Sequence, residues 1–173
     1  MGPPNPGNGL GESVYNENST FQWEHIGMSE KIKEILVPVD GSENAIRAAR
    51  FAMSMAKAMD IGVRLFYVFP AASVEVIGMA GMSRADIDQA AQAAAQRAFD
   101  QTRDALGEDL IERVEQETSI GDPAEEIIRY TEDDNTVLVV LGRRGLSRMK
   151  SLLLGSVSDK VLRYARSPVS VIT

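Results

Sequence analysis

Short runs of continuous apolar residues, separated by stretches with a helical period, constrain this chain's fold more than any other feature. Residues 35–39 and 137–141 are two such runs, and neither contains a polar residue. A strand of this kind is buried on both faces, as in a parallel sheet covered by helices. Between them, residues 42–59 place alanine and methionine on one side of a helix that Ser42 can cap. The pattern therefore predicts βα units rather than hairpins.

Three more strands complete the predicted sheet. They are expected at 63–69, at 168–172 and, more exposed to solvent, at 112–118, where neutral residues alternate with charged ones. We interpret the segment 70–82 as a long connection of small residues that could cover a ligand. The order of elements predicts an α/β fold, namely an open, Rossmann-like, five-stranded parallel sheet with helices on both faces.

Capping signals mark two further helix starts. Ser83 is followed three residues later by Asp86, and Asp122 is followed by Pro123 and Glu125. Both patterns are typical of a helix N-terminus. Because ligands of doubly wound sheets bind at the carboxyl ends of strands where the strand order reverses, we expect the site at the ends of the first, second and fourth strands.

Composition excludes several classes of function. The formal net charge is −7, which argues against a nucleic-acid partner because duplex binding needs a basic surface. The sequence has no cysteine, which excludes disulfides, thiol nucleophiles and cysteine-ligated metals. No apolar run has the length of a membrane span, and the first residues lack a secretory signal. We therefore expect a cytoplasmic protein.

Residues 1–27 differ from the rest of the chain. Glycine, proline, asparagine and serine dominate there, and no helical or strand period is visible. We interpret this stretch as a disordered extension or an expression leader, and we expect the folded domain at 28–173. The alternative is a docking segment, in which Phe21 and Trp23 would pack on a partner.

A loop with glycines at both ends follows the fourth predicted strand. It begins Gly142-Arg143-Arg144-Gly145, continues for nine residues, and ends at Gly155-Ser156, where a helical pattern begins. A strand, a glycine loop and a helix N-terminus together direct backbone N–H groups and a helix dipole at an anion. The loop contains four cations and no acid, in a chain whose net charge is −7.

Each feature of the loop also has a structural explanation. Gly142 and Gly145 could supply positive φ, Ser156 and Asp159 could form a capping box, and the cations could be a solvated surface. Their combination, with Asp40 expected across the crevice, favours a phosphorylated small molecule as the ligand.

These motifs resemble the nucleotide-binding subgroup of the universal stress protein family. The resemblance covers about residues 31–173 and is carried by 35–42, 121–127, 168–172 and the glycine loop. It implies an adenine nucleotide α-hydrolase-like fold, binding of ATP with Mg²⁺ or Mn²⁺ on the phosphates, and a homodimer formed through the last strand, 168–173.

The resemblance also implies roles for individual positions. Pro38, Val39 and Val68 would line the adenine pocket, and Asp40 would hold the ribose. The residues implied around the ribose and phosphates are Gly142, Arg143, Arg144, Gly145, Leu146, Ser147 and Arg148, followed at the helix start by Gly155, Ser156, Val157 and Ser158. No protein ligand to the metal is implied.

The sequence gives little support to a fast enzyme. The only histidine is His25, outside the expected domain, and no G-x4-G-K-[ST] loop is present. We expect an ATP-binding homodimer that acts as a nucleotide-dependent sensor or regulator in the stress response, through an unidentified protein partner. Two alternatives stay open: a slow Mg²⁺-dependent ATPase, and an interaction module that binds another nucleotide such as cyclic AMP.

Overall fold

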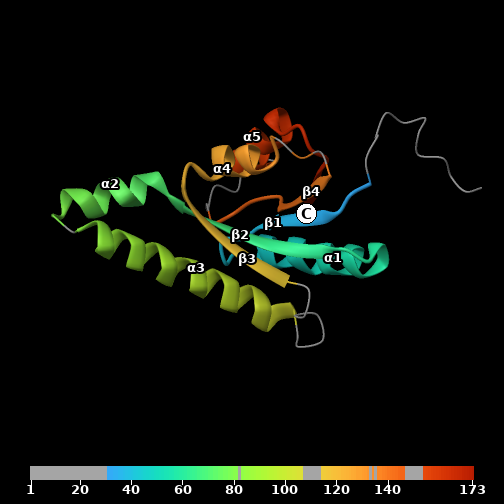
Figure 1. The fold of residues 1–173 in the computed structure, drawn as a ribbon, viewed down its shortest axis with the longest axis horizontal. Helices are drawn as coiled ribbons and strands as arrows, with labels where there is room; N and C mark the ends of the chain where they lie inside the picture. The colour runs from blue at the N-terminus through green and yellow to red at the C-terminus, as the bar shows by residue number, and fades with distance from the viewer. Residues whose placement is uncertain (1–30, 82, 107–113, 133, 135, 147–153) are drawn as a thin grey trace, which may run out of the picture.

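One parallel sheet forms the centre of the computed structural model, which describes residues 31–81, 83–106, 114–132, 134, 136–146 and 154–173 (Figure 1). The sheet has five strands in the order β3-β2-β1-β4-β5. Their bounds are β1 Glu34–Pro38, β2 Gly62–Pro70, β3 Val114–Gly121, β4 Val137–Gly142 and β5 Val169–Ile172. The expected α/β fold with a five-stranded parallel sheet is confirmed.

Helices cover both faces of the sheet. Their bounds are α1 Glu43–Met59, α2 Ala71–Met79, α3 Arg84–Leu106, α4 Pro123–Tyr130 and α5 Ser156–Tyr164. Helices α1 and α3 pack into one apolar cluster with the sheet, while α4 and α5 pack into the cluster on the opposite face. None of the helices in the described part of the chain is long and apolar enough to cross a membrane.

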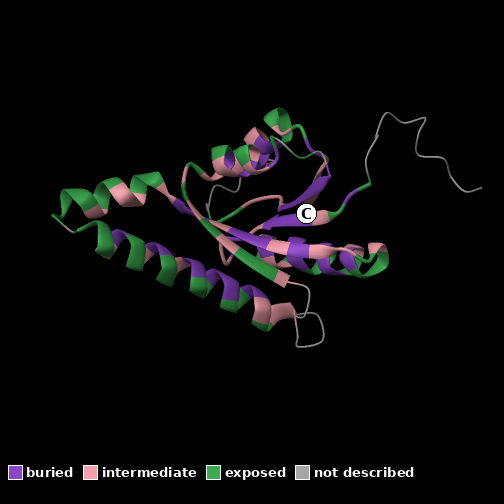
Figure 2. Cartoon of the chain, in the orientation of Figure 1, coloured by how far each residue is buried: buried purple, intermediate pink, exposed green. Residues whose placement is uncertain are grey.

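Burial is concentrated on the central strands and on the inner faces of α1 and α3 (Figure 2). Ile35, Leu36 and Val37 of β1 are each 0% exposed, as expected of a strand covered on both faces. Alanines Ala48, Ala49, Ala52 and Ala56 fill the inner face of α1, and their small side chains let this helix lie close against the sheet.

The connection expected at 70–82 is instead helix α2 over most of its length. The expectation of a connection without a helix was therefore wrong, because nine residues that include alanine, valine and isoleucine form a helix there. Helix α2 contacts α3, and both helices extend past the sheet in Figure 1. No residue of α2 is buried and none lines the cavity described below, so α2 does not cover a ligand site in this structure.

The chain reverses its direction of winding between β1 and β4. These strands are adjacent and parallel, although β2 and β3 lie between them in the sequence. Helix α1 leaves the end of β1 toward one face of the sheet, and α5 follows β4 on the other face. The two departing helices open a crevice at the carboxyl ends of β1 and β4, where the sequence predicted the site.

Candidate functional site

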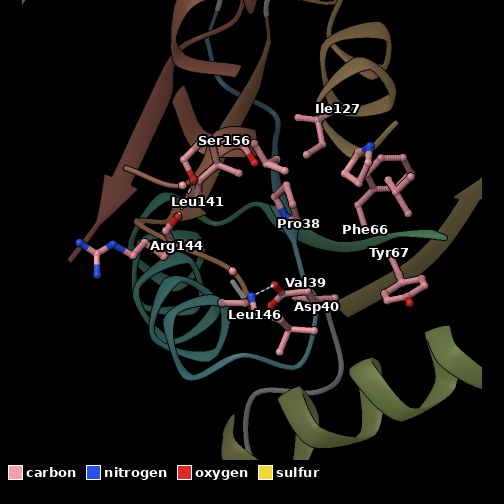
Figure 3. Close-up of a pocket in the computed structure, with 18 of the residues that line it drawn as sticks. Pro38, Val39, Asp40, Phe66, Tyr67, Ile127, Leu141, Arg144, Leu146 and Ser156 are labelled. Carbon is pink, nitrogen blue, oxygen red and sulfur yellow. Dashed lines mark hydrogen bonds between the residues drawn. The ribbon is translucent and has the colours of Figure 1, made fainter. Parts of the chain in front are cut away.

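A cavity of about 290 Å³ opens at this crevice, between the ends of β1, β2 and β4 and the N-termini of α4 and α5 (Figure 3). One wall is apolar and includes Pro38 of β1, Phe66 and Val68 of β2, and Ile127 of α4. The Phe66 ring is held against Tyr130, with 5.4 Å between the ring centroids. A cavity of this type suits a flat apolar group.

The opposite wall contains the N-terminus of α5, which no side chain of the described residues caps. Gly155 is the N-cap residue and Ser156 is the first helical residue, so the capping box considered for Ser156 is wrong. The first N–H groups of a helix, here those of Ser156, Val157 and Ser158, have no partner inside the helix. They form a row of donors at the positive end of the helix dipole, beside the cavity.

Positive φ does not explain the glycines of the loop. Among the described glycines only Gly41 and Gly81 have positive φ. The alternative that Gly142 and Gly145 supply positive φ is therefore wrong.

Close approach explains two of these glycines better. A Cβ at Gly142 would lie 2.6 Å from the backbone carbonyl carbon of Asn44, in the first turn of α1. A Cβ at Gly145 would collide with the carboxylate of Asp40. The glycines therefore let the loop pack directly against the turn between β1 and α1.

Backbone hydrogen bonds fix the start of the loop between β5 and α5. The Arg143 N–H donates to the Ile172 carbonyl at 2.7 Å, and the Gly155 N–H donates to the Arg143 carbonyl at 2.9 Å. The Ser158 hydroxyl donates to the Gly142 carbonyl at 2.9 Å. The Ser158 hydroxyl, implied as a phosphate ligand, is thus engaged with the backbone, whereas the helix leaves its N–H group available.

Asp40 crosses the crevice from β1 to the loop. Its Oδ1 accepts a hydrogen bond from the Ser42 N–H at 2.9 Å. Its Oδ2 accepts one from the Leu146 N–H at 3.0 Å, drawn as a dashed line in Figure 3. The carboxylate therefore joins two segments of the chain at the mouth of the cavity.

Tyr67 also lines the cavity, and its ring packs on Phe99 of α3 with 6.4 Å between the ring centroids. Burial raises the pKa of the Tyr67 phenol above its ordinary value; the positive charge of Arg97 opposes this shift and the negative charge of Asp40 adds to it. At neutral pH the phenol stays protonated and can donate a hydrogen bond.

The Arg144 guanidinium points away from the centre of the cavity (Figure 3).

The expected site residues line this cavity with the exception of Arg143, Ser147 and Arg148. Ser147 and Arg148 lie outside the described residues. Arg143 is not part of the lining, and its buried Nε has no hydrogen-bond partner among the described residues. Residues that line the cavity but were not expected from the sequence are Ala45, Phe66, Tyr67, Pro70, Pro123, Ile127 and Leu141. The alternation of inward and outward side chains on β2 was the signal available for Phe66.

Comparison with known proteins places this geometry in a family. The model of the universal stress protein family matches residues 31–173. Universal stress protein MJ0531 of Methanocaldococcus jannaschii is 30% identical over 144 residues, which cover 81% of each chain. The solved structure of MJ0577, from the same organism, has a TM-score of 0.65 and 26% identity, and covers 83% of this chain and 96% of that one.

A third comparison adds evidence on the fold alone. The structure of a universal stress protein in complex with cAMP has a TM-score of 0.58 and 22% identity, and covers 83% of this chain and 99% of that one. The match to the family model spans every described strand and helix. The chain therefore belongs to the universal stress protein family.

Proposed function

We propose that the cavity binds an adenine nucleotide, with ATP as the principal ligand, and that the protein is a nucleotide-dependent sensor or regulator in the stress response. One observation carries the proposal: an apolar cavity and the uncapped N-terminus of α5 face the same crevice. A nucleotide combines an apolar ring with a polyanion, and this crevice offers a complementary surface to each.

The phosphates belong at the start of α5. The N–H groups of Gly145, Ser156 and Val157 can donate to phosphate oxygens, and the helix dipole favours negative charge there. The glycines of the loop carry no Cβ atoms that would obstruct a phosphate group at these N–H groups. Binding would thus supply the partners that a capping side chain supplies at other helices.

The nucleoside belongs in the apolar part of the cavity. Pro38, Val39 and Val68 line it next to Asp40, whose carboxylate is an acceptor suited to ribose hydroxyls. A cavity of about 290 Å³ is at the lower end of the usual range for ligand sites. It accommodates the nucleoside part, while the phosphates extend along the mouth toward α5.

The proposal assigns Mg²⁺ or Mn²⁺ to the nucleotide rather than to the protein. Within the described residues, no group of three or more histidine, aspartate or glutamate side chains is arranged to hold a metal ion. In nucleotide sites, Mg²⁺ is commonly bound by phosphate oxygens and keeps several of its water ligands. We expect hydrolysis of ATP to be slow at most.

The same proposal includes a homodimer through residues 168–173. Strand β5 is the last strand of the sheet, so one of its edges has no neighbouring strand among the described residues. All four residues of β5 are partly exposed. Such an edge can pair with a second copy of the chain. A dimer could present the nucleotide state to an unidentified regulatory protein.

Calorimetric titration of MgATP into the purified chain tests the nucleotide proposal, with AMP and cyclic AMP as competitors. We expect saturable binding near one nucleotide per chain, which Gly145→Val abolishes because its side chain would collide with Asp40. Gly78→Ala is the matched control, since a Cβ at Gly78 meets no atom within 4 Å. Tighter binding of cyclic AMP than ATP would reassign the ligand, and no binding of any nucleotide would refute the proposal.

A further inference from the structure

We infer that Asp40 is a positioning residue, which holds the described start of the glycine loop, residues 142–146, in place for phosphate before any ligand arrives. The inference goes beyond contact with ribose, because it assigns a function to Asp40 in the ligand-free protein. It deepens the proposed function, and its predicted effect on binding rests on that function. The hydrogen bond between Asp40 and Leu146 itself needs no nucleotide.

The geometry of the carboxylate supports this role. Ser42 N–H and Leu146 N–H donate to different oxygens of Asp40, at 2.9 Å and 3.0 Å. The first bond holds the carboxylate at the end of β1, and the second reaches a residue 106 positions later in the chain. Bonds from N–H groups to an ionised carboxylate are stronger than neutral ones. Asp40 is thus a bridge between the β1–α1 turn and the glycine loop.

The sequence around both ends of the bridge fits the same role. Gly145 has no Cβ, and any Cβ there would occupy the position of the Asp40 carboxylate. On the other side, Gly41 has a φ of +79°, and a Cβ there would collide with the Gln101 side chain of α3. The turn that carries Asp40 therefore packs on α3. On the other side, Gly145 leaves space for the Asp40 carboxylate.

A positioning role and a purely ribose-binding role differ in the sign of one effect. Asp40→Asn removes a negative charge from the crevice, so electrostatics alone would strengthen the binding of an anion. An asparagine side chain has one acceptor oxygen and cannot accept both N–H groups through separate oxygens. If Asp40 positions the loop, binding of inorganic tripolyphosphate, which has no ribose, should instead weaken.

The first measurement uses the ligand-free protein. Amide hydrogen exchange at Leu146 should be faster by roughly an order of magnitude in Asp40→Asn than in the natural sequence, because the N–H loses a charged acceptor. Gly145→Ala should give the same acceleration while it keeps the carboxylate, which separates loss of the bond from loss of the charge. Unchanged exchange at Leu146 in both variants would overturn the inference.

The second measurement is the affinity for tripolyphosphate. We expect roughly five-fold weaker binding in Asp40→Asn, since the bond to the Leu146 N–H lies at an exposed position and a single such bond contributes modestly. Asp122→Asn is the matched control: it removes the same charge from the same edge of the sheet, and its affinity should equal or exceed that of the natural sequence.

The outcomes separate this inference from the proposed function. Equal or tighter tripolyphosphate binding in Asp40→Asn would overturn the positioning role, even where ATP binds normally. If the natural sequence binds neither ATP nor tripolyphosphate, the nucleotide proposal fails, and the exchange rate at Leu146 decides alone whether Asp40 holds the loop.

Discussion

Helices α4 and α5 begin at the same edge of the sheet and on the same face, yet their N-termini are built in opposite ways. Asp122 caps α4 and accepts a hydrogen bond from the Glu125 N–H at 3.0 Å. Pro123, the first residue of α4, has no N–H to satisfy. Helix α5 begins after Gly155, and no side chain among the described residues caps it.

The contrast separates a structural helix start from one that is available for binding. An N-cap side chain commonly contributes about 1 kcal/mol to stability, and α5 forgoes that contribution. At α4 the Glu125 N–H is bonded to the Asp122 cap and Pro123 has no N–H, whereas at α5 the first N–H groups face a cavity. The difference agrees with the proposal that the α5 donors serve a ligand, and each of the following predictions tests that proposal.

The largest effect is expected when an acid is placed at the first position of α5, in addition to Asp159 later in the same turn. Ser156→Asp should weaken ATP binding by about 100-fold, because a carboxylate at the helix start repels phosphate and competes for the same N–H groups. The same change should raise the free energy of unfolding by up to about 1 kcal/mol, since an acid is favourable in the first turn.

Calorimetry and urea denaturation measure these two changes in Ser156→Asp. Ser156→Ala is the control, and we expect only a few-fold change in affinity because the backbone donors remain. Unchanged ATP affinity in Ser156→Asp would show that phosphate does not lie at α5.

The reciprocal change at α4 should affect stability and spare binding. Asp122→Ala removes the cap and should lower the free energy of unfolding by about 1 kcal/mol, with ATP affinity within about two-fold of the natural sequence. Urea denaturation and calorimetry measure the two quantities. A large loss of nucleotide affinity would mean that both helix starts belong to the binding site, and the contrast between them would fail.

Local signals explain why the sequence predicted α4 so well. Asp122, Pro123 and Glu125 act within one helical turn, so their pattern reveals the helix start without knowledge of the fold. Helix α2 lacks such a signal: its N-cap residue is Pro70, which has no side-chain hydrogen bond to the helix. Without a capping signal, the sequence pattern suggested a connection of small residues rather than a helix.

In the candidate site, too, some residues could be predicted from a local pattern, whereas others depend on contacts between distant parts of the chain. The glycine loop was recognised from spacing within one segment, and most of its described residues line the cavity. The contribution of Ile127 depends on how α4 sits over β2, and the Asp40–Leu146 hydrogen bond joins residues 106 positions apart. Such contacts follow from strand order and register, which the one-dimensional pattern did not contain.

A smaller, pH-dependent effect should also distinguish the two helix starts. The hydrogen bond from the Glu125 N–H, aided by Lys160, holds the pKa of Asp122 below its ordinary value. Its stabilising contribution is therefore present above the unfolded-state pKa of about 3.9 and is lost as the pH falls through the lower folded-state value.

The destabilisation caused by Asp122→Ala should accordingly be largest near neutral pH and should shrink in acid. The free energies of unfolding at pH 7 and near pH 3 measure the change, with the natural sequence compared at each pH. Because Asp122 is about half exposed, we expect a difference of less than 1 kcal/mol between the two pH values. A difference independent of pH would assign the effect of the substitution to lost packing rather than to the charged cap.

The smallest effect should come from the residue that links the two helix starts. Lys160 of α5 donates to Asp122 at 3.3 Å and to Glu125 at 3.0 Å. Its side chain is 40% exposed, and exposed ion pairs contribute little, so Lys160→Met should lower the free energy of unfolding only slightly, by less than Asp122→Ala does. Arg163→Met, which breaks the Asp159 pair within α5, is the control. If Lys160→Met also changes ATP affinity while Arg163→Met does not, the α4 cap helps to orient α5, and the two helix starts form one coupled unit.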